Sequence, residues 1–281
     1  MVLSCFLFTC MGAMLRDISQ VLPSSEVVFL RNVVSLMIML PWMLRNHRNV
    51  LHATRPWLLC GRSAVNAVSM LAWGAAVARI PLADATAIGF TAPLFATACA
   101  TFVLGERVGP RRWSAVGVGF FGMLLIVRPE ASGLSTGAGL AILCAAATAW
   151  GTLLLKLLMR TENPNTVVFY LYAVAVPLTG IPAFVVWETP TLAQLGWIAI
   201  MGLLVTAGHQ CHARSFSEAD ASAVLPFDFS KLLFAALIGF AFFAEVPDIW
   251  VWIGAGIIFV SSTYTARREA ALSRIARAVS D

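Results

Sequence analysis

The chain has 281 residues, of which 59% are apolar and only 12% are charged, and its net charge is +5. Ordinary soluble domains carry about 25% charged residues, so this composition excludes a soluble globular protein. The mean hydropathy of +0.84 and the dense recurrence of apolar runs predict an α-helical protein that crosses a membrane several times.

Ten apolar runs follow one another along the chain, and each has about the length that a membrane-spanning helix needs. Prolines and polar residues stand at the ends of the runs, as at Pro23, Pro81 and Pro110. We therefore expect an all-α membrane protein with almost no residues left for a soluble domain. The predicted spans are residues 2–21, 26–44, 57–78, 82–104, 111–128, 137–159, 164–187, 191–213, 218–244 and 248–266.

The second half of the chain repeats the first at an offset of 139 positions, which carries Glu106 onto Glu245 and Trp113 onto Trp252. Each copy holds five predicted spans, and an odd number forces the second copy to lie upside down relative to the first. We expect two inverted five-helix repeats, an organisation that is typical of secondary transporters with a midplane site. The expected units are residues 1–128 and 137–266, a linker at 129–136 and a basic cytoplasmic tail at 267–281.

Basic residues are distributed unevenly between the two sides of the membrane that ten spans would create. With a cytoplasmic N-terminus, the cytoplasmic loops and tail hold 13 Lys and Arg residues, and the opposite loops hold only Arg79 and Arg128. Cytoplasmic loops are enriched in positive residues, so we expect a multi-pass protein of the inner (plasma) membrane with both termini cytoplasmic. The positive net charge is explained by this topology and does not indicate a nucleic-acid partner.

Several short motifs recur in a fixed order. They are Leu30-Arg31-Asn32, Thr91-Ala92-Pro93-Leu94-Phe95, Leu104-Gly105-Glu106 and Phe243-Ala244-Glu245. In order, spacing and duplication they resemble the ten-helix EamA-type branch of the drug/metabolite transporter superfamily, over essentially the whole chain. The resemblance implies export of small metabolites, including amino acids, or of toxic compounds, and the nearest branch is the aromatic and neutral amino acid exporters.

Two features depart from the patterns of this superfamily. Phe243-Ala244-Glu245 stands where Leu-Gly-Glu is expected, and the first span lacks the glutamate that the small four-helix exporters of cationic drugs use. The second departure weakens a proton-coupled drug exporter as an interpretation.

Asp228 and Lys231 are the charged residues farthest from the ends of their predicted span. They lie ten to thirteen residues into the ninth span, about 15–20 Å from its start at 1.5 Å per residue, and their i, i+3 spacing puts them on one face. Two interpretations stay open: the pair neutralises itself inside the bundle, or it binds the ammonium and carboxylate of a zwitterion. Phe227 and Phe229 would then offer apolar surface to the substrate.

The other charged residues of the spans are interpreted as structural. Arg16, Asp17, Arg31 and Arg62 lie within one or two turns of a span end, where long side chains reach the interface. We expect Arg16, Asp17 and Arg31 to form an ion-pair cluster, and Asp84 to favour the positive end of a helix dipole.

The remaining candidates for substrate contact are uncharged or weakly basic. Asn66 and Trp73 lie two turns apart on the third span, Trp150 on the sixth, Tyr170 on the seventh and His209 on the eighth. Pro93 and Pro226, in corresponding spans, are the expected hinges. His209 and His212 share a face without a third ligand, and the six cysteines are interpreted as small buried side chains. We expect no metal and no cofactor.

The function that these features favour is a secondary transporter that exports small neutral or zwitterionic metabolites, amino acids above all, by alternating access through a midplane cavity. The alternative is a proton-coupled exporter of cationic compounds. A serine–histidine intramembrane protease with Ser63 and His209, and a membrane scaffold, fit the sequence less well, so we expect no enzyme. The expected partners are a small-molecule substrate and the lipid bilayer, with the chain as a monomer or homodimer.

Overall fold

The computed structural model describes residues 1–45, 53–92, 94–96, 110–127, 135–159, 161–218, 225–261 and 263–264. Within these ranges the chain forms helices and no strand, and it ends in an apolar helix at Ile249–Ser261, here called the C-terminal helix. The earlier elements are α1 (Val2–Ile18), α2 (Ser24–Arg45), α4 (Pro56–Val77), α5 (Leu82–Gly89), α7 (Pro110–Val127), α8 (Thr136–Leu158), α9 (Pro164–Val185), α10 (Leu192–Glu218), the 3-10 helix η1 (Leu225–Phe229) and α12 (Ser230–Phe243).

These elements confirm the predicted all-helical membrane fold. Within the described ranges, α2, α8, α9 and α10 each contain a stretch long and apolar enough to cross a membrane, and Trp113–Val127 and Ile249–Ser261 are shorter apolar helices. The largest cluster of buried hydrophobic side chains draws on α1, α2, α4, α9 and α10. A second cluster joins α5, α7, α8, α12 and the C-terminal helix.

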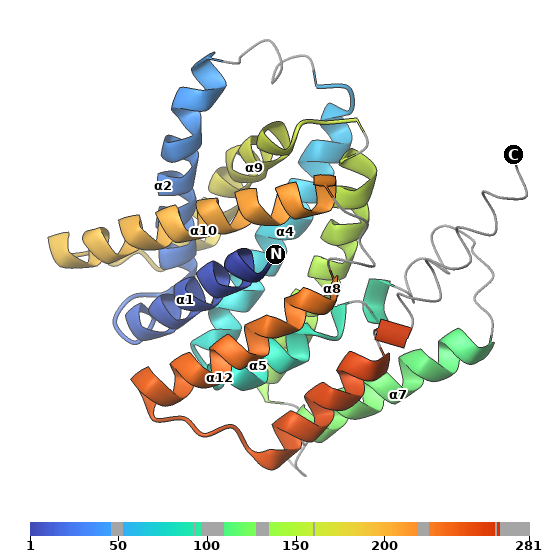
Figure 1. The fold of residues 1–281 in the computed structure, drawn as a ribbon. Coiled ribbons are helices and arrows are strands. Elements are labelled where there is room, and N and C mark those ends of the chain that lie inside the picture. The colour runs from blue at the N-terminus through green and yellow to red at the C-terminus, as the bar shows by residue number, and fades with distance from the viewer. Residues whose placement is uncertain are drawn as a thin grey trace, which may run out of the picture.

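The helices pack as two related sets (Figure 1). α1 lies between α10 and α12, and these two helices contact it along much of its length. At the offset of 139 positions α8 corresponds to α1, and it packs against α4 and α5, which belong to the spans that correspond to α10 and α12. The contacts of the first helix of one repeat are therefore reproduced by the first helix of the other.

The same relation appears in single contacts between α7 and the C-terminal helix. A methyl group on Gly122 would lie 2.9 Å from the carbonyl oxygen of Gly254, so the two backbones touch here. The hydroxyl of Ser261 donates to the carbonyl of Ala115. Gly122 corresponds to Ser261, and Ala115 corresponds to Gly254. The Gly122–Gly254 contact and the Ala115–Ser261 contact are therefore equivalent, related by a pseudo-two-fold axis.

Two predicted spans are interrupted or shifted in the structure. α5 ends at Gly89, where the N–H groups of Phe90 and Thr91 donate three residues back, to the carbonyls of Ala87 and Ile88, instead of four. α10 continues to Glu218 instead of ending at residue 213, so the predicted start of the ninth span at residue 218 is wrong. That span also changes type: η1 contains Pro226, and regular α-helix begins only at Ser230.

Ala244 ends α12 in a left-handed conformation, with φ 52° and ψ 28°, and is the one non-glycine residue with positive φ that the described ranges contain. Glycine is the usual residue at such a helix end because it has no Cβ to clash. At the offset of 139 positions the first repeat has Gly105. The departure at Phe243-Ala244-Glu245 thus places alanine where the backbone favours glycine.

Candidate functional site

Asp228 and Lys231 form an ion pair where η1 passes into α12. Lys231 Nζ lies 2.6 Å from Asp228 Oδ1, and the two side chains are 23% and 27% exposed. The 3-10 helix presents Asp228, and the first turn of α12 presents Lys231 on the same side. The predicted proximity of these residues is confirmed.

α1 covers this ion pair with two side chains. Cys5 Sγ lies 3.6 Å from Asp228 Oδ1 and donates to it, and Lys231 Nζ lies 5.5 Å from the centre of the Phe8 ring. A cation at this distance from an aromatic face is attracted by the ring. Cys5 and Phe8 were not among the predicted site residues, because a cysteine and a phenylalanine in an apolar run have the pattern of ordinary core residues.

Phe8 also connects the ion pair to the histidines of α10. Its ring centre lies 4.9 Å from that of His209 and 6.1 Å from that of His212, and Tyr172 of α9 lies 5.9 Å from His209 on the other side. The structure therefore brings His209, Asp228 and Lys231 together around Phe8. Among the described residues no group of three or more His, Cys, Asp or Glu side chains has the arrangement of a metal site.

The predicted candidates on α4, α8 and α9 make contacts of their own. Asn66 donates from Nδ2 to the Arg62 carbonyl and packs against Gly151 of α8, the neighbour of Trp150. Trp73 packs against Gly12 of α1. Tyr170 belongs to a separate cluster with Leu59, Leu155, Leu158 and Val167.

The two aromatic residues beside the ion pair, Phe227 and Phe229, have different surroundings. Phe227 is 55% exposed, and its backbone carbonyl accepts from Cys5 and Ser230. The ring of Phe229 stacks on Phe90 at 4.4 Å in the second hydrophobic cluster. The ring of Phe8 lies against Lys231, and contact of Phe227 and Phe229 with the substrate stays a prediction.

Of the two expected hinges, Pro93 lies outside the described residues, and Pro226 lies in η1 at the break before α12. Asp84 lies in the first turn of α5, as predicted from the preceding proline.

The predicted ion-pair cluster of Arg16, Asp17 and Arg31 is wrong. Arg16 pairs with Glu245 at the far end of α12, and Asp17 is exposed. Arg31 is 1% exposed and Arg62 is 6% exposed, so neither side chain reaches the interface as expected. The prediction failed because the burial of these arginines is set by neighbouring helices and not by their distance from a span end.

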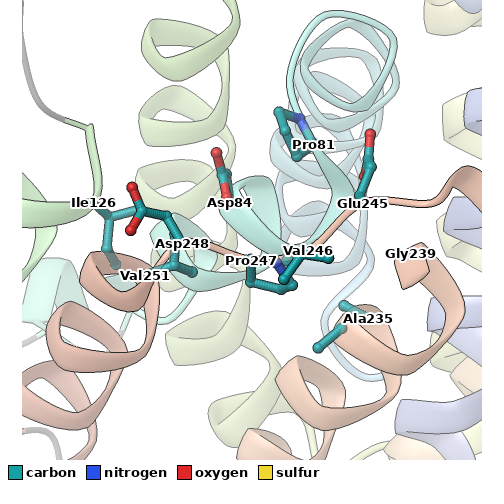
Figure 2. Close-up of a pocket in the computed structure, with 12 residues that line it drawn as sticks. Pro81, Asp84, Ile126, Ala235, Gly239, Glu245, Val246, Pro247, Asp248 and Val251 are labelled. Atoms are coloured by element: carbon teal, nitrogen blue, oxygen red, sulfur yellow. The ribbon is translucent and has the colours of Figure 1, made fainter.

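A cavity of about 390 Å³ opens at the C-terminal end of α12, beside Glu245 (Figure 2). The start of α5, the end of α7, and the segment from Glu245 to Val251 surround it, with Asp84, Glu245 and Asp248 as its carboxylates. Glu245 belongs both to this cavity and to the ion pair with Arg16. The cavity and the Asp228–Lys231 pair therefore lie at opposite ends of α12.

The chain is similar to known membrane transporters. The model of the EamA-like transporter family matches residues 1–128 and 135–267. A riboflavin transporter of Rhizobium johnstonii is 32% identical over 248 residues, which cover 88% of this chain and 82% of that protein. An S-adenosylmethionine uptake transporter of Rickettsia bellii is 29% identical, with 88% of this chain and 85% of that protein covered.

The pseudopaline exporter CntI of Pseudomonas aeruginosa is 29% identical, with 95% of both chains covered. A solved crystal structure matches 94% of this chain and 98% of its own with a TM-score of 0.59 and 17% identity, which shows a shared fold.

Proposed function

Because the chain belongs to the EamA-like transporter family, we propose that it exports small zwitterionic or neutral metabolites, with amino acids as the leading substrate class. Family membership makes the chain a multi-pass membrane transporter of small molecules and not an enzyme. The relatives include proteins named for uptake and for export, so the direction belongs to the proposal.

The observation that carries this proposal is the Asp228–Lys231 ion pair beneath α1. A charged side chain within a membrane span costs free energy unless it is paired or functional, so such residues mark substrate pathways by default. The pair offers an anion for a substrate ammonium, and the rings of Phe8 and His209 offer apolar surface beside it. Amino acids and metabolites that contain them carry both an ammonium group and an apolar side chain, which match these two parts of the site.

Alternating access is proposed to occur between the two repeats. α1 of the first repeat packs against α10 and α12 of the second, so a rocking of one repeat on the other changes the walls of the site. Arg16 and Glu245 join the repeats at the end of α12 that carries the cavity. With both termini cytoplasmic, this ion pair lies at the extracytoplasmic side of the inner membrane and breaks when that side opens.

A second candidate function is transport of a flat heterocyclic metabolite such as riboflavin. One observation favours it: Phe8, Tyr172, His209, His212 and Phe216 form a connected set of rings across α1, α9 and α10. Offset and edge-to-face contacts of such rings suit a planar substrate, and the relative from Rhizobium johnstonii is named for riboflavin.

Proteoliposomes that contain the purified full chain test these functions. The labelled substrates are neutral and aromatic amino acids, S-adenosylmethionine, riboflavin and a cationic dye, each with and without an imposed pH gradient. We expect saturable amino acid flux that does not depend on the gradient. Flux of riboflavin alone supports the second candidate, and gradient-driven dye movement without amino acid flux supports the proton-coupled exporter and contradicts our proposal.

A further inference from the structure

Two arginines are buried in the first repeat without an ionic partner. Arg31 of α2 places Nη1 2.7 Å from Met11 Sδ, and its Nε has no hydrogen-bond partner. Arg62 of α4 leaves both Nε and Nη1 without a partner. Neither guanidinium forms an ion pair with any residue that the structure describes.

The nearby carboxylates do not neutralise these arginines. Asp17 is exposed, and Glu26, the buried carboxylate of α2, accepts the backbone N–H of Glu188 on its Oε2. Asp228 is held by Lys231. An isolated charge is costly to bury away from water, and an arginine stays protonated, so the described residues leave both arginines without a negative partner.

The helices that carry the two arginines, α2 and α4, both pack against α9. Tyr172 of α9 lies within electrostatic reach of both guanidinium groups. His209 of α10 lies within reach of Arg31 and Arg62 and also of Lys231. The ring of Tyr172 lies 5.9 Å from His209, and His209 contacts Phe8, which lies over Lys231. Rings therefore connect the helix against which the arginines pack to the Asp228–Lys231 pair.

We infer that Arg31 and Arg62 form a binding site for the carboxylate of the transported metabolite. A guanidinium presents several N–H donors in one plane, which matches the two oxygens of a carboxylate. The inference rests on the proposed function and extends it. The substrate carboxylate binds the arginines of the first repeat, its ammonium lies by Asp228 of the second, and its side chain passes His209 and Phe8.

In this arrangement Lys231 does not bind the substrate carboxylate. Lys231 stays with Asp228 and limits the strength with which that carboxylate holds an ammonium, while the arginines supply the anion site. A bound zwitterion thus connects the two repeats, and its release separates them.

The test measures thermal unfolding of the purified full chain in detergent with phenylacetate and with phenylacetamide, its neutral isostere. We expect phenylacetate to raise the Tm in a saturable way and phenylacetamide to leave it unchanged. Arg31→Gln and Arg62→Gln should each weaken the apparent affinity for phenylacetate roughly thirty-fold or more, and Arg62→Lys should restore part of it. Arg79→Gln is the matched control, because Arg79 is exposed at the end of its helix.

Each result bears on one claim. Equal shifts from phenylacetate and phenylacetamide, or no shift from either, overturn the anion site. If a glutamine variant fails to fold, the wild-type comparison of the two isosteres still decides. A phenylacetate-specific shift without amino acid flux in proteoliposomes keeps the anion site and removes the proposed function. Amino acid flux that survives both glutamine substitutions removes the anion site and keeps the function.

Discussion

The two repeats make the same helix contacts, but their charged residues lie at different positions. Gly122 with Gly254 and Ala115 with Ser261 make related contacts on both sides of the pseudo-two-fold axis. The charged residues follow no such rule: Arg31 and Arg62 correspond to Tyr170 and Met201, and Asp228 and Lys231 correspond to Gly89 and Ala92.

This difference teaches that duplication preserved the contacts that hold the helices at a fixed distance, while the polar groups at the centre diverged. A symmetric scaffold with an asymmetric site suits a substrate whose two ends differ in charge.

The largest effect is expected from breaking the charge pair of the second repeat. Lys231→Met should reduce transport at least 100-fold and, because it leaves Asp228 without its partner, should lower stability by about 3 kcal/mol. The double variant Asp228→Asn with Lys231→Met should regain most of that stability and none of the transport. Proteoliposome flux and thermal unfolding measure the two quantities. If the double variant transports as well as wild type, the pair serves the fold alone.

The shared packing is tested at the crossing of α7 and the C-terminal helix. A Leu at Gly254 would put its Cβ 2.5 Å from the Gly122 carbonyl oxygen, so Gly254→Leu should cost about 3 kcal/mol by overpacking. Gly256→Leu is the control on the same helix, because a Cβ there meets nothing within 4 Å. Denaturation midpoints of the two variants give the comparison, and equal losses would contradict close packing at Gly254.

The ion pair between the repeats should have a smaller effect on stability. Arg16 and Glu245 are 18% and 21% exposed, so Glu245→Gln should lower stability by about 1 kcal/mol. Its effect on transport rate should exceed its effect on binding, because the pair joins helices that separate during the cycle. The exchange Arg16→Glu with Glu245→Arg should recover much of the loss. A rate that the single substitution leaves unchanged would argue against a role in opening.

The smallest effect concerns the left-handed residue at the end of α12. Ala244→Gly should raise the free energy of unfolding by about 1 kcal/mol, because glycine adopts φ 52° without a Cβ clash. Ala241→Gly, an exposed position inside the same helix, should lower it by about 1 kcal/mol. Chemical denaturation distinguishes the two signs, and a loss at both positions would show that Ala244 is not strained.

Much of the architecture followed from local patterns. The apolar runs predicted the helices, and the odd number of spans per copy predicted the inversion that the packing of α1 and α8 reflects. A break inside the fourth span was also predictable, since Pro93 in its interior removes a backbone donor. The end of α10 at Glu218 could not be predicted from the sequence. It depends on packing against neighbouring helices, which the local pattern does not show.

The candidate site was only partly predictable. The Asp228–Lys231 contact is local, three residues apart on one helical turn, so the sequence alone determined it together with the fold class and the repeat. Tertiary structure decided that Phe8 covers this pair, that Arg16 reaches Glu245, and that Arg31 and Arg62 are buried. Distance along a helix shows how near a residue lies to a span end, but burial depends on neighbouring helices from distant parts of the chain.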